Sequence, residues 1–331
     1  MAASERDGVP LTNLDQPLFD GAGATKRDLV DYLDAMSAPI LSVLAGRPLS
    51  VVRVLRGQPP FMQKNVPGYA PPWVRTVPLW AQASGREVRY ALCDDRRTLL
   101  WFANQRAVEY HPALVRAPDW DRPTHLVLDI DPPDGESFGR AVLAARLAGM
   151  ALAGAGLAGA VKTSGAKGLH VFVPLDGSSA AEDVAAATRA LAARTERIDP
   201  GLATTAFIKE DRQGKVFIDS TRAGGATVVA AYSPRARPGT PVSFPVAWAD
   251  LDSVTPADFT VRTAVALAAG GASGAGGADV AGGDPWAALM PPPQALPAGL
   301  IAEGHAIPVA RVQAMHEGKR RARARRELSD G

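Results

Sequence analysis

The sequence predicts a layered α/β (α+β) fold in which helices alternate with strands and pack on sheets. Short apolar runs, such as those that end at Asp131 and Asp219, have the length and composition of buried strands. Longer segments between such runs repeat apolar residues at helical spacing. The chain has 331 residues, 47% of them hydrophobic, which is enough for a substantial core in one large domain with appendages.

The clearest helix is predicted over residues 26–44, which we expect to pack on a sheet. Its apolar residues recur at helical spacing: Leu29, Leu33, Met36 and Ile40. Thr25 is the expected N-cap, because a threonine hydroxyl accepts a hydrogen bond from a free backbone N–H of the first turn. Two more helices are predicted over 137–157 and 180–197, each between two strands.

No segment of the sequence is an uninterrupted apolar stretch long enough to span a membrane. The nearest segment is 141–161, where Arg146 and many small residues favour a buried helix. The single cysteine, Cys93, excludes an internal disulfide, and the N-terminal MAASERDGVP lacks the apolar core of a signal peptide. We therefore expect a cytoplasmic protein.

Composition divides the chain into three parts. Residues 270–283, GGASGAGGADVAGG, are half glycine without apolar periodicity, which is typical of a flexible linker. We place the main domain at 1–268, the linker at 269–284, and a proline-rich strap followed by a basic C-terminal helix at 285–331. The formal net charge is only +2, so any surface for nucleic acid has to be local.

The clearest basic run lies in the predicted C-terminal helix. It consists of Lys319, Arg320, Arg321, Arg323, Arg325 and Arg326. A solvated tail helix and a contact with nucleic acid or a partner explain this run equally well.

Three aspartates at strand ends are the strongest chemical signal. In HLVLDID, Asp129 and Asp131 are two residues apart, so a strand projects both from one face. Two carboxylates this close raise each other's pKa unless a cation lies between them. In KVFIDST, Asp219 supplies a third carboxylate if the two strands are neighbours, and three carboxylates suit Mg²⁺ or Mn²⁺. An isolated D-x-D before two prolines is also typical of a strand that runs into a turn with solvated aspartates.

A glycine-rich segment, SGAKGLH, lies between two predicted strands at residues 164–170. Its two glycines allow a tight turn that brings backbone N–H groups near an anion, and Lys167 and His170 add charge or hydrogen-bond donors. The segment can therefore hold a triphosphate, although a plain hairpin is the commoner use of a Gly-Lys pair. Its spacing differs from the phosphate loop that precedes a helix in common nucleoside triphosphatases.

In this order and spacing, the three motifs resemble the archaeo-eukaryotic primase superfamily. Within it they resemble the LigD-type primase-polymerase, which is the polymerase domain of bacterial non-homologous end-joining DNA ligases. Other segments in the family's order are TNLDQPLF, GATKRDLVDYL, LAGRPLSVVR, GQPPFMQKN, APPWV, AAYSPRAR and the stretch 107–111. The resemblance covers about residues 10–265. It implies a primase-type catalytic core at about 111–265, with mixed or antiparallel central sheets flanked by helices. It also implies an N-terminal part for DNA and 5′-phosphate binding at about 10–110.

By this resemblance, Asp129, Asp131 and Asp219 are the catalytic residues and hold two divalent ions, Mn²⁺ or Mg²⁺. One ion lowers the pKa of the primer 3′-hydroxyl, and the other holds the triphosphate and stabilises the departing pyrophosphate.

The resemblance also implies a set of nucleotide-binding residues: Arg53, His111, Ser164, Lys167, Gly168, His170, Arg222, Arg235 and Arg237. Arg235 and Arg237 alternate on an extended segment, so both guanidiniums point one way, with exposed surface arginines as the alternative. His111 precedes a proline and is also compatible with a turn residue.

The implied DNA-binding residues are Asn13, Lys26, Phe61, Met62 and Lys64. The sequence departs from the family here. Gln16 stands where a lysine of the 5′-phosphate pocket is common, so phosphate recognition depends on Lys26 with Lys64 and Arg27. Met62 replaces the second of two stacking aromatics, and Arg222 in RAGG replaces a glutamine-containing stretch.

We therefore expect a DNA-dependent nucleotidyltransferase that extends primers at short gaps or broken ends and, like its relatives, prefers ribonucleotides. Expected partners are gapped or end-resected DNA with a 5′-phosphate, NTPs or dNTPs, a separate ATP-dependent DNA ligase and Ku. The protein itself is expected to be a nucleoid-associated monomer. Fewer than about 70 residues follow the core, which is too few for a ligase domain.

Two other functions fit parts of the sequence. One is a non-catalytic DNA end- or gap-binding module of the same fold, which the three carboxylates disfavour because they repel DNA when no metal is bound. The other is a metal-dependent nuclease, which the lysine, histidine and arginine set for a triphosphate disfavours.

Overall fold

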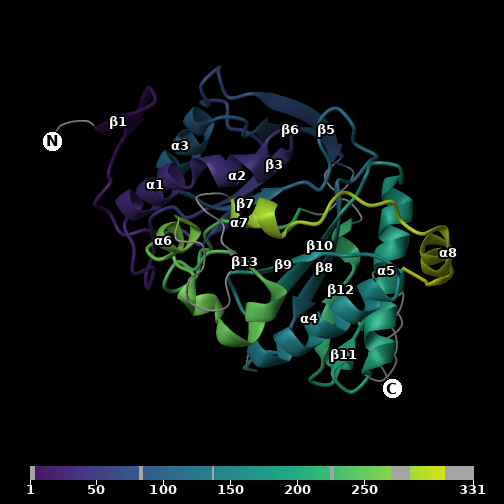
Figure 1. Cartoon of the computed structure of the whole chain (residues 1–331). Coiled ribbons are helices and arrows are strands. Elements are labelled where there is room, and N and C mark those ends of the chain that lie inside the picture. The colour runs from purple at the N-terminus through teal and green to yellow at the C-terminus, as the bar shows by residue number, and fades with distance from the viewer. Residues whose placement is uncertain (1–3, 82–84, 136–137, 224–226, 270–283, 310–331) are drawn as a thin grey trace, which may run out of the picture.

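The computed structural model describes residues 4–81, 85–135, 138–223, 227–269 and 284–309. Two sheets lie at its centre, an N-terminal one of five strands and a second one of six strands (Figure 1). The buried apolar residues of both halves form one continuous cluster. The predicted α/β fold with mixed and antiparallel sheets flanked by helices is therefore confirmed.

The N-terminal sheet has the strand order β4-β3-β6-β5, and β7 pairs with β3 as well. Its strands are β3 (Pro48–Arg53), β4 (Phe61–Gln63), β5 (Thr76–Ala81), β6 (Arg86–Leu92) and β7 (Ala107–Pro112). A small hairpin precedes it, made of β1 (Ser4–Arg6) and β2 (Val9–Leu11). The helices of this half are α1 (Lys26–Ala35), α2 (Ser37–Leu44) and α3 (Arg96–Asn104).

The helix predicted over 26–44 is in fact two helices, α1 and α2, which meet at Met36. Pro39 explains the break, because a proline inside a helix cannot donate to the carbonyl four residues back and its ring collides with that carbonyl. The predicted cap is correct: the Thr25 hydroxyl accepts a hydrogen bond from the backbone N–H of Asp28. The four apolar residues of the expected stripe are all buried, as predicted.

The second sheet has the strand order β11-β12-β8-β10-β9-β13 and positions the candidate site. All neighbours are antiparallel except β11 and β12. Its strands are β8 (His125–Asp131), β9 (Ala160–Thr163), β10 (Leu169–Pro174), β11 (Ala203–Thr204), β12 (Val216–Asp219) and β13 (Pro245–Val246). The strands predicted around the three motifs are thus present.

Two long helices flank this sheet, α4 (Phe138–Ala153) and α5 (Ala181–Ile198), close to the predicted ranges. Helix α4 is only partly buried: its small residues face the core, but Leu143 and Met150 are exposed. Among the described residues, no helix is long and apolar enough to span a bilayer. Short 3₁₀ helices complete the connections at Lys209–Arg212, Thr221–Ala223, Trp248–Ser253 and Pro256–Asp258.

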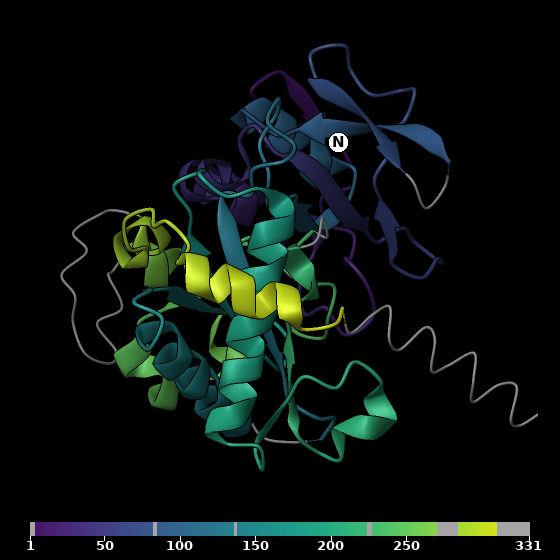
Figure 2. The same cartoon turned by 90° about the vertical axis from the view of Figure 1, so that its right-hand side faces the viewer.

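The C-terminal part of the described chain contains three short helices, α6 (Ala264–Ala269), α7 (Pro285–Leu289) and α8 (Ala298–Ala306). The segment predicted as a proline-rich strap is therefore extended only between α7 and α8, where Gln294 bridges to Leu175. Helix α8 lies across α5 (Figure 2), and Gly304 permits the close approach, since an added Cβ would lie 1.8 Å from the Ala186 carbonyl oxygen. The predicted linker at 270–283 and the basic run from Lys319 to Arg326 lie outside the described residues.

Candidate active site

Two of the three aspartates are brought together by direct strand pairing. Strand β12 pairs with β8, and Asp219 lies opposite Asp129 in the antiparallel register. Asp131 lies two residues further along β8 on the same face. Asp129 and Asp219 are each only 6% exposed. The alternative of solvated aspartates in a turn, which concerned Asp129 and Asp131, is therefore wrong for Asp129.

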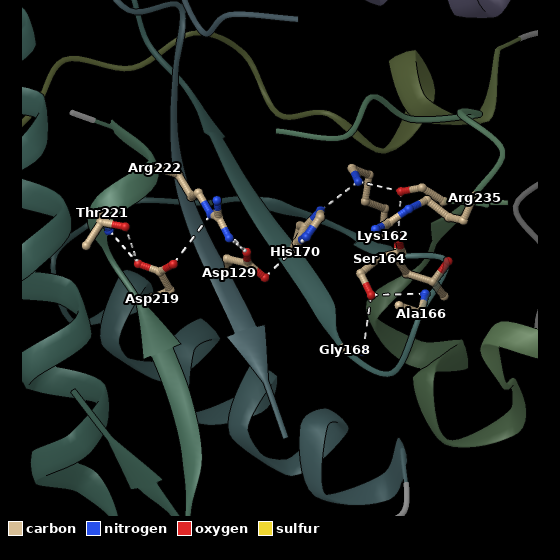
Figure 3. A network of polar contacts seen from close by, with 12 residues as sticks. Asp129, Lys162, Ser164, Ala166, Gly168, His170, Asp219, Thr221, Arg222 and Arg235 are labelled. Atoms are coloured by element: carbon tan, nitrogen blue, oxygen red, sulfur yellow. Dashed lines mark hydrogen bonds and ion pairs between the residues drawn. The ribbon is translucent and has the colours of Figure 1, made fainter. Parts of the chain in front are cut away.

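The Arg222 guanidinium lies between these two carboxylates (Figure 3). Its Nη2 is 2.9 Å from Asp129 Oδ2, and its Nε is 3.0 Å from the same oxygen and 3.4 Å from Asp219 Oδ2. The other oxygen of Asp219 accepts hydrogen bonds from the backbone N–H and the hydroxyl of Thr221, at 2.8 and 2.6 Å. Arg222 was predicted to bind nucleotide, but its contacts here are with the two aspartates.

The carboxylates differ in their pKa values because they differ in their partners. Burial and the charge of Asp129 raise the pKa of Asp131 to about 6. Burial alone would also raise the pKa of Asp129, but its interactions with His170 and Arg222 hold it well below the usual value. The site thus carries more negative charge than Arg222 neutralises, which is the condition that favours a further cation.

The donor set fits a hard divalent ion. Asp129, Asp131 and Asp219 offer carboxylate oxygens, which are the ligands that Mg²⁺ and Mn²⁺ prefer. In the described part of the chain, however, no three acidic, histidine or cysteine side chains converge closely enough to hold an ion as they stand. Because Arg222 takes the place between Asp129 and Asp219, an ion bound by both would require Arg222 to move.

A polar row continues from Asp129 across the next two strands. His170 on β10 lies opposite Asp129, and Lys162 on β9 lies opposite His170. The His170 Nε2 is 3.2 Å from Asp129 Oδ1, and its Nδ1 is 2.8 Å from Lys162 Nζ. Burial and the nearby Lys162 lower the pKa of His170 to about 4, so the imidazole is neutral at pH 7.

The segment 164–168 is a hairpin loop that joins β9 and β10. The Ser164 hydroxyl accepts hydrogen bonds from the N–H groups of Ala166 and Gly168, at 3.2 and 3.1 Å. These donors, which the sequence suggested for a phosphate, are therefore used inside the loop. Gly168 is needed for packing as well, because an added Cβ would lie 2.1 Å from the Ile130 carbonyl oxygen.

Lys167 extends from this loop toward solvent and forms an ion pair with Asp134, 2.8 Å between Nζ and Oδ1. A cavity of about 340 Å³ adjoins the loop and is lined by Gly165, Lys167 and Arg237 among others. Arg237 is exposed, so two cations of the predicted nucleotide set border one hollow. Exposed ion pairs exchange partners at little cost, which leaves Lys167 available to an anion.

Arg235 has a different environment from Arg237. Its Nε forms an ion pair with Glu109 Oε1 at 3.2 Å, and its Nη1 donates to the Ser164 carbonyl oxygen. His111 lies inside β7, not in a turn, with its Nε2 2.8 Å from Glu109 Oε2. Burial alone would raise the pKa of Glu109, but the hydrogen bond from His111 and the charge of Arg235 lower it to about 2.

Arg53, predicted to bind nucleotide, contacts residues around the predicted template-stacking side chain. Its Nη1 donates to Gln63 Oε1 and the Tyr69 hydroxyl, both at 3.0 Å, and its guanidinium lies 5.9 Å from the centre of the Phe61 ring. Phe61 and Met62 are 37% and 45% exposed on β4. Together with Tyr69 they form an exposed aromatic and basic surface of the N-terminal sheet.

Lys26, predicted to hold a 5′-phosphate, is only 3% exposed. Its Nζ donates to the Thr12 carbonyl oxygen and to Asn104 Oδ1, both at 2.6 Å. Burial and the charge of Arg106 lower its pKa to about 8. Asn13 is exposed with a positive φ of 54°, and Lys64 is exposed.

A hollow lies near Lys26. A cavity of about 680 Å³ is lined by Gln16, Arg56, Arg106 and their neighbours. Gln16, the position where the family commonly has lysine, borders this cavity together with two arginines. Two arginines that were not selected from the sequence therefore border this cavity, and the Arg106 guanidinium already donates to the carbonyl oxygens of Val54, Pro17 and Leu18.

Sequence reasoning did not select Lys162, Ser243 or Glu109. Lys162 lies two residues before the SGAKGLH motif. The hairpin around this motif pairs Lys162 with His170, and this cross-strand pairing is the signal that would have identified Lys162. Glu109 is two residues before His111 on one strand face, so the same alternation pairs them. Ser243 accepts a hydrogen bond from Lys162, with Oγ 2.5 Å from Nζ, but it comes from a distant loop and carries no local signal.

Comparison with known proteins agrees with this geometry. Residues 25–272 match the LigD primase-polymerase domain family. The multifunctional non-homologous end joining DNA repair protein LigD of Mycobacterium tuberculosis is 34% identical over 268 residues, which covers 76% of this chain and 34% of that protein. The bifunctional non-homologous end joining protein LigD of Bacillus subtilis is 32% identical over 262 residues, covering 78% of this chain and 42% of that protein. The chain thus spans well under half the length of these relatives.

A solved structure is also similar. The polymerase domain from Mycobacterium tuberculosis Ligase D in complex with DNA matches with a TM-score of 0.73 and 32% sequence identity, covering 80% of this chain and 95% of that chain. The family match over residues 25–272 spans both sheets and all three aspartates. On this evidence the chain belongs to the LigD primase-polymerase domain family.

Proposed function

We propose that this chain is a DNA-directed nucleotidyltransferase that extends a primer at short gaps or broken DNA ends during repair. The observation that carries the proposal is the row of Asp219, Asp129 and His170 on three adjacent strands, within a fold whose relatives are named for non-homologous end joining. We further propose that it prefers ribonucleotides, as its sequence resemblance implies.

The proposed metal site is formed by Asp129, Asp131 and Asp219. A pair of divalent ions, Mn²⁺ or Mg²⁺, would lower the pKa of the primer 3′-hydroxyl and stabilise the negative charge on the leaving pyrophosphate. The protein's own part is to fix these carboxylates by strand pairing, so that little reorganisation is needed at the moment of reaction.

The nucleotide side of the site is proposed to lie on the β9–β10 hairpin. Lys167 and Arg237 border the cavity beside this loop and offer charge-assisted hydrogen bonds to phosphate oxygens. His170, whose Nε2 lies 3.2 Å from Asp129 Oδ1, offers one more N–H donor beside the carboxylates that would hold the ions. Arg222 is proposed to leave Asp129 when the ions bind and to contact the incoming nucleotide.

The DNA side is proposed to be the N-terminal half. Phe61 is exposed beside the Arg53 guanidinium and is suited to stack on a template base. The cavity between Gln16, Arg56 and Arg106 is suited to a downstream 5′-phosphate. A separate ATP-dependent ligase would seal the product, with Ku as a further partner and the protein acting as a monomer.

Primer extension tests this proposal. The substrate is a short-gapped duplex with a 5′-phosphate, with NTPs compared with dNTPs in Mg²⁺ or Mn²⁺, and the Asp129→Ala/Asp131→Ala protein is the control. We expect templated addition that the double variant lacks, with faster addition of ribonucleotides. DNA binding without addition under any of these conditions would favour the non-catalytic end-binding module, and primer shortening without nucleotides would favour a nuclease.

A further inference from the structure

A further cavity, which the proposed reaction does not use, lies where both halves of the molecule meet α7. Its volume is about 270 Å³, and none of the three aspartates lines it. Its lining comes from α2, the end of β7, the start of β8, β10 and α7 (Figure 1). The family match ends at residue 272, so the α7 side of this cavity lies outside the matched range. Arg116 and Ala287 are exposed at its border, so a solute can reach it.

Arg47 is a buried cation in the wall of this cavity, and it is only 5% exposed. Its Nη1 donates to the Ala113 carbonyl oxygen at 3.2 Å, and its Nη2 donates to Thr124 Oγ1 at 2.7 Å. Both partners are neutral, and no carboxylate in the described part of the chain forms an ion pair with Arg47. A buried charge without a counter-charge is costly, and a guanidinium has five N–H donors, so Arg47 has both charge and donors left for an anion.

Arg116 brings a second guanidinium to the same cavity. Burial, followed by the charge of Arg116, lowers the pKa of Arg47 to about 10, so the two cations act on each other. Burial and the charges of both arginines lower the pKa of His125, which also lines the cavity, to about 3. The imidazole is therefore neutral at pH 7, and two positive charges remain at this end of the cavity.

An acidic side chain of the cavity does not neutralise these charges. Among the described residues that line the cavity, Asp284 is the only acidic one. Its Oδ1 accepts hydrogen bonds from the Tyr232 hydroxyl and from the backbone N–H of Trp286, the latter at 2.9 Å. The Ser42 hydroxyl lies 3.1 Å from its Oδ2. Asp284 is thus committed to holding the start of α7 against the core.

The rest of the wall is apolar and partly aromatic. Phe172 and Trp286 are 8% and 6% exposed, and their ring centres lie 5.4 Å apart at an angle of 86°. Val43, Leu114 and Met290 also line the cavity. Aromatic walls of this kind suit a flat ring, which packs edge-to-face or in an offset stack. The volume is just below the range of about 300–1,000 Å³ that drug-sized ligands occupy, so the ring has to be a small one.

We propose that this cavity binds a small aromatic molecule that carries one anionic group, either a carboxylate or a phosphate. Arg47 and Arg116 hold the anionic group by charge-assisted hydrogen bonds. The ring lies against Phe172 and Trp286. The inference does not depend on the proposed nucleotidyl transfer, because binding is measured without catalysis.

Isothermal titration calorimetry of the full chain tests this proposal. The probes are benzoate and phenyl phosphate, which carry a carboxylate and a phosphate on the same ring. Benzamide, which has the ring without the charge, and inorganic phosphate, which has the charge without the ring, are the controls. We expect at least one of the two probes to bind with one site per chain, about 10-fold or more tightly than either control. The stronger probe identifies the anionic group.

Two matched pairs of variants locate the site. Arg116→Met should weaken binding of the stronger probe by about 10- to 100-fold, the loss of a charged hydrogen bond. Arg122→Met removes an exposed arginine from the same connection that does not line the cavity, and it should leave the affinity unchanged. Ala287→Phe should abolish binding by filling the cavity from α7. Ala288→Phe, on the neighbouring exposed residue that does not line it, should not.

All four positions are exposed, so the variants are expected to fold, and urea unfolding checks this. The proposal would be overturned if neither probe bound the wild type, or if a control bound as tightly as the stronger probe. It would also be overturned if folded Arg116→Met or folded Ala287→Phe bound that probe as tightly as the wild type. A protein that binds a probe at this cavity but does not extend primers would refute the proposed function alone.

Discussion

Asp131→Asn is expected to stabilise the metal-free protein at neutral pH while abolishing primer extension. Burial and the negative charge of Asp129 raise the pKa of Asp131 to about 6 from a usual value of 3.8. A carboxyl whose pKa is raised on folding contributes stability below its unfolded pKa and loses it as the pH rises through its folded pKa. The ionised Asp131 therefore opposes folding above about pH 6, and an isosteric amide removes that cost.

The magnitude follows from the shift. A shift of about two pKa units, at about 1.4 kcal/mol for each unit, gives a cost of about 3 kcal/mol at pH 7.5. Partial solvent access reduces this cost. We therefore expect Asp131→Asn to raise the free energy of unfolding by about 1–3 kcal/mol. At pH 4 the difference from the wild type should be close to zero, because Asp131 is then largely protonated in the folded state.

Urea denaturation at pH 4, 5.5 and 7.5 in the presence of a chelator measures this difference. Asp129→Asn is the matched control and should have the opposite sign, because it removes a carboxylate that accepts a hydrogen bond from His170 and forms an ion pair with Arg222. Adding Mn²⁺ should stabilise the wild type more than Asp131→Asn, since the ion supplies the missing positive charge. Equal pH dependence of the wild type and Asp131→Asn in chelator would refute the reasoning about charge in this site.

Three further substitutions test other parts of the molecule. Gly168→Ala should lower the free energy of unfolding in urea by about 1–3 kcal/mol and reduce extension, because the added Cβ would lie 2.1 Å from the Ile130 carbonyl oxygen. Gly299→Ala is the control and should not destabilise the protein, because the space around Gly299 is open. Phe61→Ala should weaken binding to a template overhang by about 1–3 kcal/mol in fluorescence anisotropy, and an unchanged affinity would exclude stacking. Lys26→Ala should destabilise the fold, because Lys26 donates two internal hydrogen bonds. It should also weaken binding to a gap that carries a 5′-phosphate more than binding to a gap without this phosphate. Equal losses on the two DNA substrates would leave Lys26 a structural role only.

Local periodicity predicted most of the elements. The strands around the motifs and the helices near 137–157 and 180–197 were found where the sequence places them, because alternation and helical spacing are properties of neighbouring residues. The break at Met36 was missed because four correctly spaced apolar residues outweighed the single proline at position 39. Helix α8 was missed because the prolines at 291–297 favour an extended strap, and helix α7 was missed because it has only five residues and begins at a proline.

Two polar features that the sequence selected for a ligand have internal partners in the structure. Lys26 was selected for its charge, yet it is buried and hydrogen-bonded within the N-terminal half. The backbone donors of SGAKG were selected for a phosphate, yet the Ser164 hydroxyl takes two of them. In both cases a residue type that suits a ligand also suits an internal partner, and only the folded structure shows which partner is nearer.

The sequence by itself determined that Asp129 and Asp131 share one face, because a strand has a period of two residues and this is a local property. Three contacts follow only from the tertiary structure: Asp219 faces Asp129, Arg222 lies between them, and Lys162 hydrogen-bonds to His170 from the far side. These contacts depend on the order and register of strands far apart in the chain. Register is set by the packing of the whole sheet, which no short stretch of sequence contains.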